Sequence, residues 1–129
     1  MNDRNLSDIP NIETLNGLID DIKKNGNLSG VILSYKDGRL IVENTERNYD
    51  FAEFIPLIAS ALRSAEDMGS CVGDSKFKRI IAQLEKTSIM ILKTNTKDAF
   101  LALIINEDSF IEPILKDFDS LSKEIEQNI

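Results

Sequence analysis

The sequence contains no histidine, no tryptophan and only one cysteine among its 129 residues. Without histidine, the chain has no imidazole base for a catalytic triad or dyad and no histidine ligand for a metal ion. A single cysteine provides neither a disulfide framework nor a cysteine zinc site within one chain. Because disulfides are the usual mark of oxidising compartments, we expect a cytoplasmic protein.

Long hydrophobic runs and an excess of basic charge are also missing. The longest apolar run, Ala99–Ile105, is far shorter than the roughly 20 residues that a helix needs to cross a bilayer. The N-terminal sequence MNDRNLSDIP is polar and resembles neither a signal peptide nor a transit peptide. The 15 basic and 22 acidic side chains give a net charge of -7, whereas phosphate backbones bind to basic surfaces. We therefore expect no membrane insertion and no nucleic-acid partner.

Motifs of catalytic and cofactor sites are absent from the sequence. It contains no P-loop, no dinucleotide fingerprint, no nucleophile elbow and no EF-hand loop. We expect no catalytic residues, no cofactor and no metal site, so we interpret the chain as a non-enzyme. Cys71 could be a reactive thiol, but no histidine is available to activate it. The acidic pairs Asp20–Asp21 and Glu107–Asp108 could hold a cation, but adjacent side chains on a helix point apart, and solvated surface is the favoured interpretation.

The residues that are present predict three helices within a single domain. The composition, 42% apolar and 29% charged, is typical of a globular domain, which we place at residues 11–129 after a flexible tail at residues 1–10. Apolar residues recur at helical spacing from Ile12 to a stop at Gly26, and Asn11 can cap this helix.

Two further helical patterns follow. One begins after Asp50, runs to about Met68 and stops at Gly69. The other begins either with a capping box of Ser109 and Glu112 or with Glu112 as the cap before Pro113 at the first helical position, and it extends towards Ile129. The predicted helices therefore lie near both ends and in the middle of the chain, and the strand-like segments lie between them.

Five segments predict strands, and turn residues separate them. The first two flank the pair Asp37-Gly38, which is a strong hairpin signal between β-branched runs. The predicted strands are Gly30–Tyr35, Leu40–Glu43, Phe77–Leu84, Ser88–Lys93 and Ala99–Ile105. The element order is therefore α-β-β-α-β-β-β-α, which is an α+β fold.

Hydrophobic patterns rank these strands within one sheet. Gly30–Tyr35, Ser88–Lys93 and Ala99–Ile105 are apolar at nearly every position, so both of their faces must be covered. Phe77–Leu84 mixes long polar with apolar side chains and suits a sheet edge, as does Leu40–Glu43. The hairpin connections favour the sheet order 2-1-5-4-3 with helices on both faces. The direction of the fifth strand relative to the first stays open.

One sheet edge and one helix flank predict self-association. On the second helix, the apolar arc that includes Leu57, Ala61 and Met68 is wider than contact with one sheet requires. The third strand offers an exposed edge, which is a template for pairing with another strand. We favour a two-fold dimer over the alternative that the 70–76 loop covers the helix flank and that basic residues only protect the edge.

Four segments carry a family resemblance. They are the L-x-x-L-I-x-x-I spacing from Leu15, G-V-I-L-S-Y-K-D-G-R-L-I-V from Gly30, I-A-S-A-L-R-S-A-E-D-M-G from Ile58 and A-F-L-A-L-I-I-N-E-D-S-F-I from Ala99. In this order they resemble roadblock/dynein light chain domains over residues 12–125. The resemblance implies a profilin-like α/β/α three-layer sandwich in which the second helix lies alone on one face.

The resemblance also implies a homodimer and a regulatory role. Roadblock domains join the third strand and the second helix across a two-fold axis, and the matching positions are Leu57, Ala61, Met68, Lys78, Ile80, Ala82 and Leu84. Family members are non-catalytic partners of small Ras-like GTPases, which implies a module that binds and regulates or scaffolds such a GTPase. The alternatives are a structural subunit of a motor or membrane-scaffold complex and a small-molecule-sensing domain, which would need a roomy pocket with converging polar groups.

Overall fold

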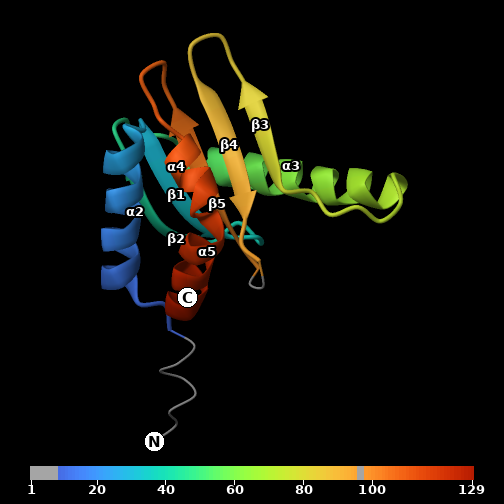
Figure 1. Ribbon diagram of the computed structural model, residues 1–129, viewed down its shortest axis with the longest axis horizontal. Helices are drawn as coiled ribbons and strands as arrows, with labels where there is room; N and C mark the ends of the chain where they lie inside the picture. Colours follow the sequence, from blue (N-terminus) through green and yellow to red (C-terminus); the bar gives the residue numbers. More distant parts are fainter. Residues whose placement is uncertain (1–8, 96–97) are drawn as a thin grey trace, which may run out of the picture.

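The computed structural model describes residues 9–95 and 98–129, which form a five-stranded sheet and four helices (Figure 1). The helices are α2 (Ile12–Gly26), α3 (Phe51–Cys71), α4 (Glu112–Lys116) and α5 (Phe118–Asn128). The strands are β1 (Gly30–Tyr35), β2 (Leu40–Thr45), β3 (Arg79–Gln83), β4 (Ser88–Lys93) and β5 (Ala99–Ile105). Residues 1–8 of the predicted tail lie outside the described residues, as do residues 96–97 of the predicted loop between β4 and β5.

The strand order β2-β1-β5-β4-β3 confirms the predicted order 2-1-5-4-3 and the α+β class. All neighbouring strands are antiparallel, including β1 and β5, where Ile32 lies opposite Ala102. The direction that the sequence left open is therefore antiparallel. β1, β4 and β5 occupy the interior of the sheet, as their nearly continuous apolar runs predicted.

Helices cover both faces of the sheet, which confirms the predicted three-layer sandwich. α3 lies alone on one face, where Ile58 and Leu62 pack with Ile32 and Phe100 (Figure 1). α2, α4 and α5 lie on the other face, whose core includes Leu15, Ile19, Val31, Leu33, Leu101, Leu103 and Ile125. Alternate residues of the central strands thus contribute to two separate cores. Within residues 9–95 and 98–129, none of the helices combines the length and the apolar content needed to span a membrane.

Capping hydrogen bonds fix the two ends of α2. The Thr14 N–H donates to Asn11 Oδ1 (3.2 Å), so Asn11 caps the helix as predicted. At the other end, Asn27 adopts the left-handed conformation (φ 49°), and its N–H bonds to the Lys24 carbonyl (3.2 Å). Gly26 is the last helical residue and is buried, so it serves packing while Asn27 makes the turn.

Gly69 does not end α3, contrary to the prediction. The helix continues to Cys71, and the chain turns at Gly73, where φ is +92°, a conformation that favours glycine. Gly69 is instead the point at which the following loop packs on the helix. The Ser75 N–H donates to the Gly69 carbonyl (2.9 Å), and a Cβ at Gly69 would overlap the Ser75 carbonyl oxygen. This close approach directs the chain back to the sheet, where β3 begins.

The last predicted helix is divided into α4 and α5 at Asp117. The Asp117 N–H donates to the Pro113 carbonyl (3.2 Å), and the Asp117 carbonyl accepts from the Leu121 N–H (2.9 Å). With φ -98° and ψ 12°, Asp117 leaves helical geometry. It therefore ends one helix and begins the next.

Two strand boundaries also differ from the prediction. β3 is limited to Arg79–Gln83, because residues 72–78 lead back from α3 and the Leu84 N–H closes the next turn on the Thr87 carbonyl (2.8 Å). β2 extends beyond its predicted end to Thr45. The edge strand β3 is thus the shortest strand in the described part of the chain.

Two glycines inside helices should respond in opposite ways to alanine. Gly69→Ala should lower the free energy of unfolding by about 1–3 kcal/mol, because the new methyl group overlaps the Ser75 backbone. Gly17→Ala, in α2, should raise it by roughly 0.5–1 kcal/mol, because its Cβ position is open and alanine favours helix. Urea denaturation of both variants measures these changes. Equal effects at the two positions would contradict the close approach of the loop to α3.

Candidate functional site

The strand β3 forms one edge of the sheet, and β4 is its only neighbour among the described strands. The Leu84 N–H bond to the Thr87 carbonyl identifies a hydrogen-bonded pair of the β3–β4 ladder. Because such pairs alternate in an antiparallel ladder, Ile80 and Ala82 also bond to β4. The backbone N–H and C=O groups that point outward at this edge therefore belong to Arg79, Ile81 and Gln83.

The predicted flank of α3 lies on the surface. Leu57 and Met68 are each 63% exposed, although burial of apolar side chains is favourable. The 70–76 loop, which was the alternative cover for this flank, leaves both side chains largely exposed. Ala61 is half-buried and packs against the core beneath α3. This flank therefore offers apolar surface that the described part of the chain does not cover.

The C-terminal half of α3 extends past β3 and beyond the edge of the sheet (Figure 1). Residues 72–78 return alongside this part of the helix to the start of β3. Met68 lies in the last turns of α3, and Val72, which follows the helix, is 73% exposed. The projecting turns therefore reach over a region that the five strands do not occupy.

The predicted residues of the third strand are unequally exposed. Ile80 is half-buried and packs with the core on the α3 side, whereas Ala82 is exposed. Lys78 precedes the strand, and Leu84, 59% exposed, lies in the turn that follows it. The prediction did not name Ile81, which is 52% exposed. Because side chains alternate along a strand, Ile81 points to the face opposite Ile80, and this alternation was the signal that could have identified it.

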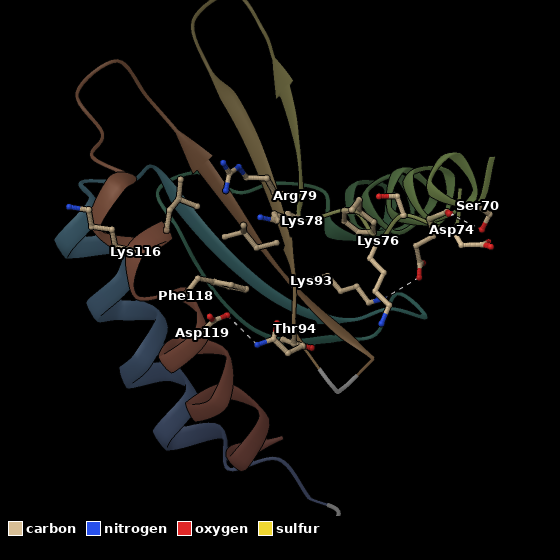
Figure 2. A pocket seen from close by; sticks show the side chains of 16 residues that line it. Ser70, Asp74, Lys76, Lys78, Arg79, Lys93, Thr94, Lys116, Phe118 and Asp119 are labelled. Atoms are coloured by element: carbon tan, nitrogen blue, oxygen red, sulfur yellow. Dashed lines mark hydrogen bonds and ion pairs between the residues drawn. The ribbon is translucent and has the colours of Figure 1, made fainter. Parts of the chain in front are cut away.

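A cleft of about 750 Å³ opens where β3 begins (Figure 2). Its lining comes from the end of α3, the loop before β3, the end of β4 and the junction of α4 with α5. Figure 2 shows Phe118 and Asp119 on one side of the cleft and Ser70 and Asp74 on the other. The basic side chains that border it are Lys76, Lys78, Arg79, Lys93 and Lys116. Sequence reasoning missed this cleft, because its walls come from distant parts of the chain.

Glu66, on α3 at the rim of this cleft, forms ion pairs with two lysines. Its carboxylate oxygens lie 2.7 Å from Lys36 Nζ and 3.3 Å from Lys93 Nζ. The hydrogen bond from Lys36, reinforced by Lys93, outweighs the opposing effect of burial and lowers the pKa of Glu66 from its ordinary value. These contacts tie α3 to the turn after β1 and to the end of β4.

The other candidate residues from the sequence lie at separate places on the surface. Cys71 is exposed on the last turn of α3. Asp20 accepts a hydrogen bond from Asn44 Nδ2 (2.7 Å), and the Asp108 N–H donates to Asn106 Oδ1 (2.8 Å). Within residues 9–95 and 98–129, no three histidine, cysteine, aspartate or glutamate side chains are grouped so that they could hold a metal ion.

Solved structures confirm the predicted resemblance to roadblock domains at the level of the fold. MglB of Myxococcus xanthus aligns with a TM-score of 0.76 at 20% identity, over 86% of this chain and 90% of that one. The gliding protein MglB of Thermus thermophilus gives a TM-score of 0.79 at 11% identity, over 91% and 90%. A Roadblock/LC7 domain from Streptomyces avermitilis gives 0.75 at 12% identity, over 86% and 93%. No protein-family model and no curated protein sequence matches the chain.

Loss of the Glu66 carboxylate should destabilise the protein in a pH-dependent way. Glu66→Gln should lower the free energy of unfolding at neutral pH by about 1 kcal/mol, because the amide lacks the charge that Lys36 and Lys93 stabilise. The folded-state pKa of Glu66 lies below 4.5, so this stabilisation is complete above 4.5 and disappears as the pH falls through the folded-state pKa.

Urea denaturation at neutral pH and at about pH 3 measures this difference. The variant and the parent protein should have nearly the same stability at the lower pH. Asp67→Asn, at an exposed position next to Glu66, is the control and should have little effect at either pH. A deficit of the same size at both pH values for Glu66→Gln would contradict the role of its charge.

Proposed function

We propose that this chain is a cytoplasmic, non-catalytic roadblock-type module that forms a homodimer and binds and regulates or scaffolds a small Ras-like GTPase. The observation that carries the proposal is the free edge of β3 beside the exposed flank of α3. At this edge the backbone N–H and C=O groups of Arg79, Ile81 and Gln83 point outward. On the flank, the side chains of Leu57 and Met68 are exposed. Unpaired strand edges and exposed apolar side chains are both surfaces that a second protein can cover.

A second copy of β3 would satisfy the outward-facing backbone groups. In an antiparallel pair centred on Ile81, this residue faces its own symmetry mate, and Arg79 faces the partner's Gln83. All three outward-facing residues then have hydrogen-bond partners. A pair centred on Ile80 leaves Gln83 without a partner, and a pair centred on Ala82 leaves Arg79 without one. We therefore propose the register centred on Ile81.

The side chains are compatible with this register. Arg79 would lie beside the amide of the partner's Gln83, so the pairing avoids repulsion between like charges. Ile81, half exposed in one chain, would contact the partner's Ile81 at the two-fold axis. The partner's β3 would also continue the sheet towards the projecting turns of α3, where Met68 would gain apolar cover.

The GTPase part of the proposal is supported by the fold shared with a Roadblock/LC7 domain and by the family resemblance in the sequence. The chain contains no histidine and no catalytic motif, so its effect on a partner would come from binding. Such a module would stabilise one arrangement of the switch segments of a GTPase, which shifts a population and adds no new chemistry.

Ile81→Lys should convert the dimer into a monomer. Lysine in an edge strand opposes pairing, and two lysines would meet at the two-fold axis. Because the Ile81 backbone is not used in the β3–β4 ladder and its side chain is half exposed, the monomer should keep its thermal stability. Sedimentation equilibrium should show a dissociation constant raised about 100-fold or more.

The matched control is Leu40→Lys, at a 41% exposed position on the opposite edge strand β2, and it should leave the dimer unchanged. Met68→Glu, on the α3 flank, should weaken the dimer as Ile81→Lys does. A parent protein that stays monomeric at every concentration would overturn the dimer. A dimer that Leu40→Lys disrupts and Ile81→Lys preserves would move the interface to β2.

The dimer should bind a small Ras-like GTPase encoded in the same genome. We expect the affinity to differ between the GDP-bound and GTP-analogue-bound forms, because the switch segments differ between these states. Biolayer interferometry with each purified GTPase measures this, and Ile81→Lys shows whether the dimer is required. Absence of binding in both nucleotide states for all of these GTPases would overturn the regulatory role and leave the dimer standing.

A further inference from the structure

We propose that the cleft at the start of β3 binds a small organic polyphosphate. The cleft measures about 750 Å³, which lies within the range of pockets that hold small molecules. The basic residues of its lining come from four parts of the chain, namely the loop before β3, β3 itself, the end of β4 and α4. Figure 2 shows the Lys116 ammonium directed away from the other four cations. The proposal does not depend on the GTPase, and two of the cleft cations, Lys78 and Arg79, are shared with the proposed dimer interface.

Positive charge is concentrated at this cleft in a chain whose net charge is -7. One third of the 15 basic residues border it, and they are Lys76, Lys78, Arg79, Lys93 and Lys116. The acidic residues in the lining are Glu66, Asp74 and Asp119. Five cations against three acids leave a local charge of +2, so the remainder of the chain has a net charge of -9. The cleft is therefore a local excess of positive charge on an otherwise acidic chain.

Ion pairs within the described part of a single chain neutralise only one of these cations. Lys93 makes an ion pair with Glu66 (3.3 Å). The cleft cations that make no ion pair within residues 9–95 and 98–129 are Lys76, Lys78, Arg79 and Lys116. Cations that share one cleft repel one another. A multivalent anion bound between them attracts each of them and so offsets this repulsion.

The other lining groups suit an organic body that carries several phosphates. The hydroxyl of Ser75 can donate to a phosphate oxygen. The half-buried rings of Phe77 and Phe118 provide an apolar wall for the rest of the ligand. A single carboxylate would balance one of these cations, whereas a di- or triphosphate balances several. A nucleic acid would need a longer basic stripe, and the rest of this chain is acidic.

The cleft can be tested apart from the proposed dimer. Lys78 and Arg79 are shared with the proposed β3 interface, so they are left unchanged. Lys76, in the loop before β3, and Lys116, at the end of α4, lie outside that interface, and both are exposed. Substitution of these two residues removes charge from two sides of the cleft and leaves the β3 edge intact.

The test is the double substitution Lys76→Gln with Lys116→Gln. The full chain is titrated calorimetrically with ATP and, separately, with inorganic tripolyphosphate at low ionic strength, where charge is least screened. We expect the parent protein to bind both probes and the double variant to bind them about tenfold more weakly. Tighter binding of ATP would show that the aromatic wall contributes, and equal binding would show that the phosphates alone are recognised. Both results support the site.

The matched control removes the same charge elsewhere. Lys24→Gln with Lys123→Gln changes two exposed lysines of α2 and α5 and should alter the affinity by less than about twofold. Equal weakening in both double variants would show a diffuse attraction to net charge and would overturn the site. Failure of the parent protein to bind either probe at millimolar concentration would also overturn it. Circular dichroism of each variant separates lost binding from lost folding, and neither overturning result affects the proposed dimer.

Discussion

Backbone N–H and C=O groups need hydrogen-bond partners, and the rest of this structure depends on that constraint. A sheet of five strands has two edges, where one row of these groups has no partner strand. At one edge, β2 packs against α2, and most of its residues are at least half-buried. At the other edge, β3 is short, and all of its residues except Ile80 are exposed. The α3 helix projects past this second edge (Figure 1), so the unpaired backbone and the uncovered helix flank lie together. This asymmetry is the reason that we place the dimer at β3.

The sequence was sufficient to predict the layout of the sheet, because hydrophobic continuity distinguishes central strands from edges. Ala99–Ile105 is apolar throughout and is central, whereas the mixed pattern around Ile80 marks an edge. Element ends were harder to predict, because they depend on contacts made after folding. Gly69 looked like a helix stop, but its lack of a side chain serves the close approach of Ser75. Ile81 was not among the predicted interface positions, because Ile80 and Ala82, which the resemblance implied, lie on the other face of β3.

The basic cleft could not be predicted from the composition of the chain. A net charge of -7 describes the whole chain and predicted no surface for phosphates, yet folding gathers a third of the basic residues at one place. Lys76, Lys78 and Arg79 are neighbours in the sequence and form a visible cluster. Lys93 and Lys116 join them only because β4 and α4 both end at the same cleft. Local charge after folding, and not the sum over the sequence, determines which anions a protein attracts.

Amide hydrogen exchange, read residue by residue by NMR over a range of protein concentrations, tests the account most directly. The amides of Ile80 and Ala82 bond to β4 in one chain, so they should be protected at every concentration. If β3 pairs with its copy, the outward-facing amides of Arg79, Ile81 and Gln83 should become protected as the concentration rises. Fast exchange at those three amides at every concentration, with Ile80 and Ala82 protected, would show that the edge stays free and would contradict the central claim.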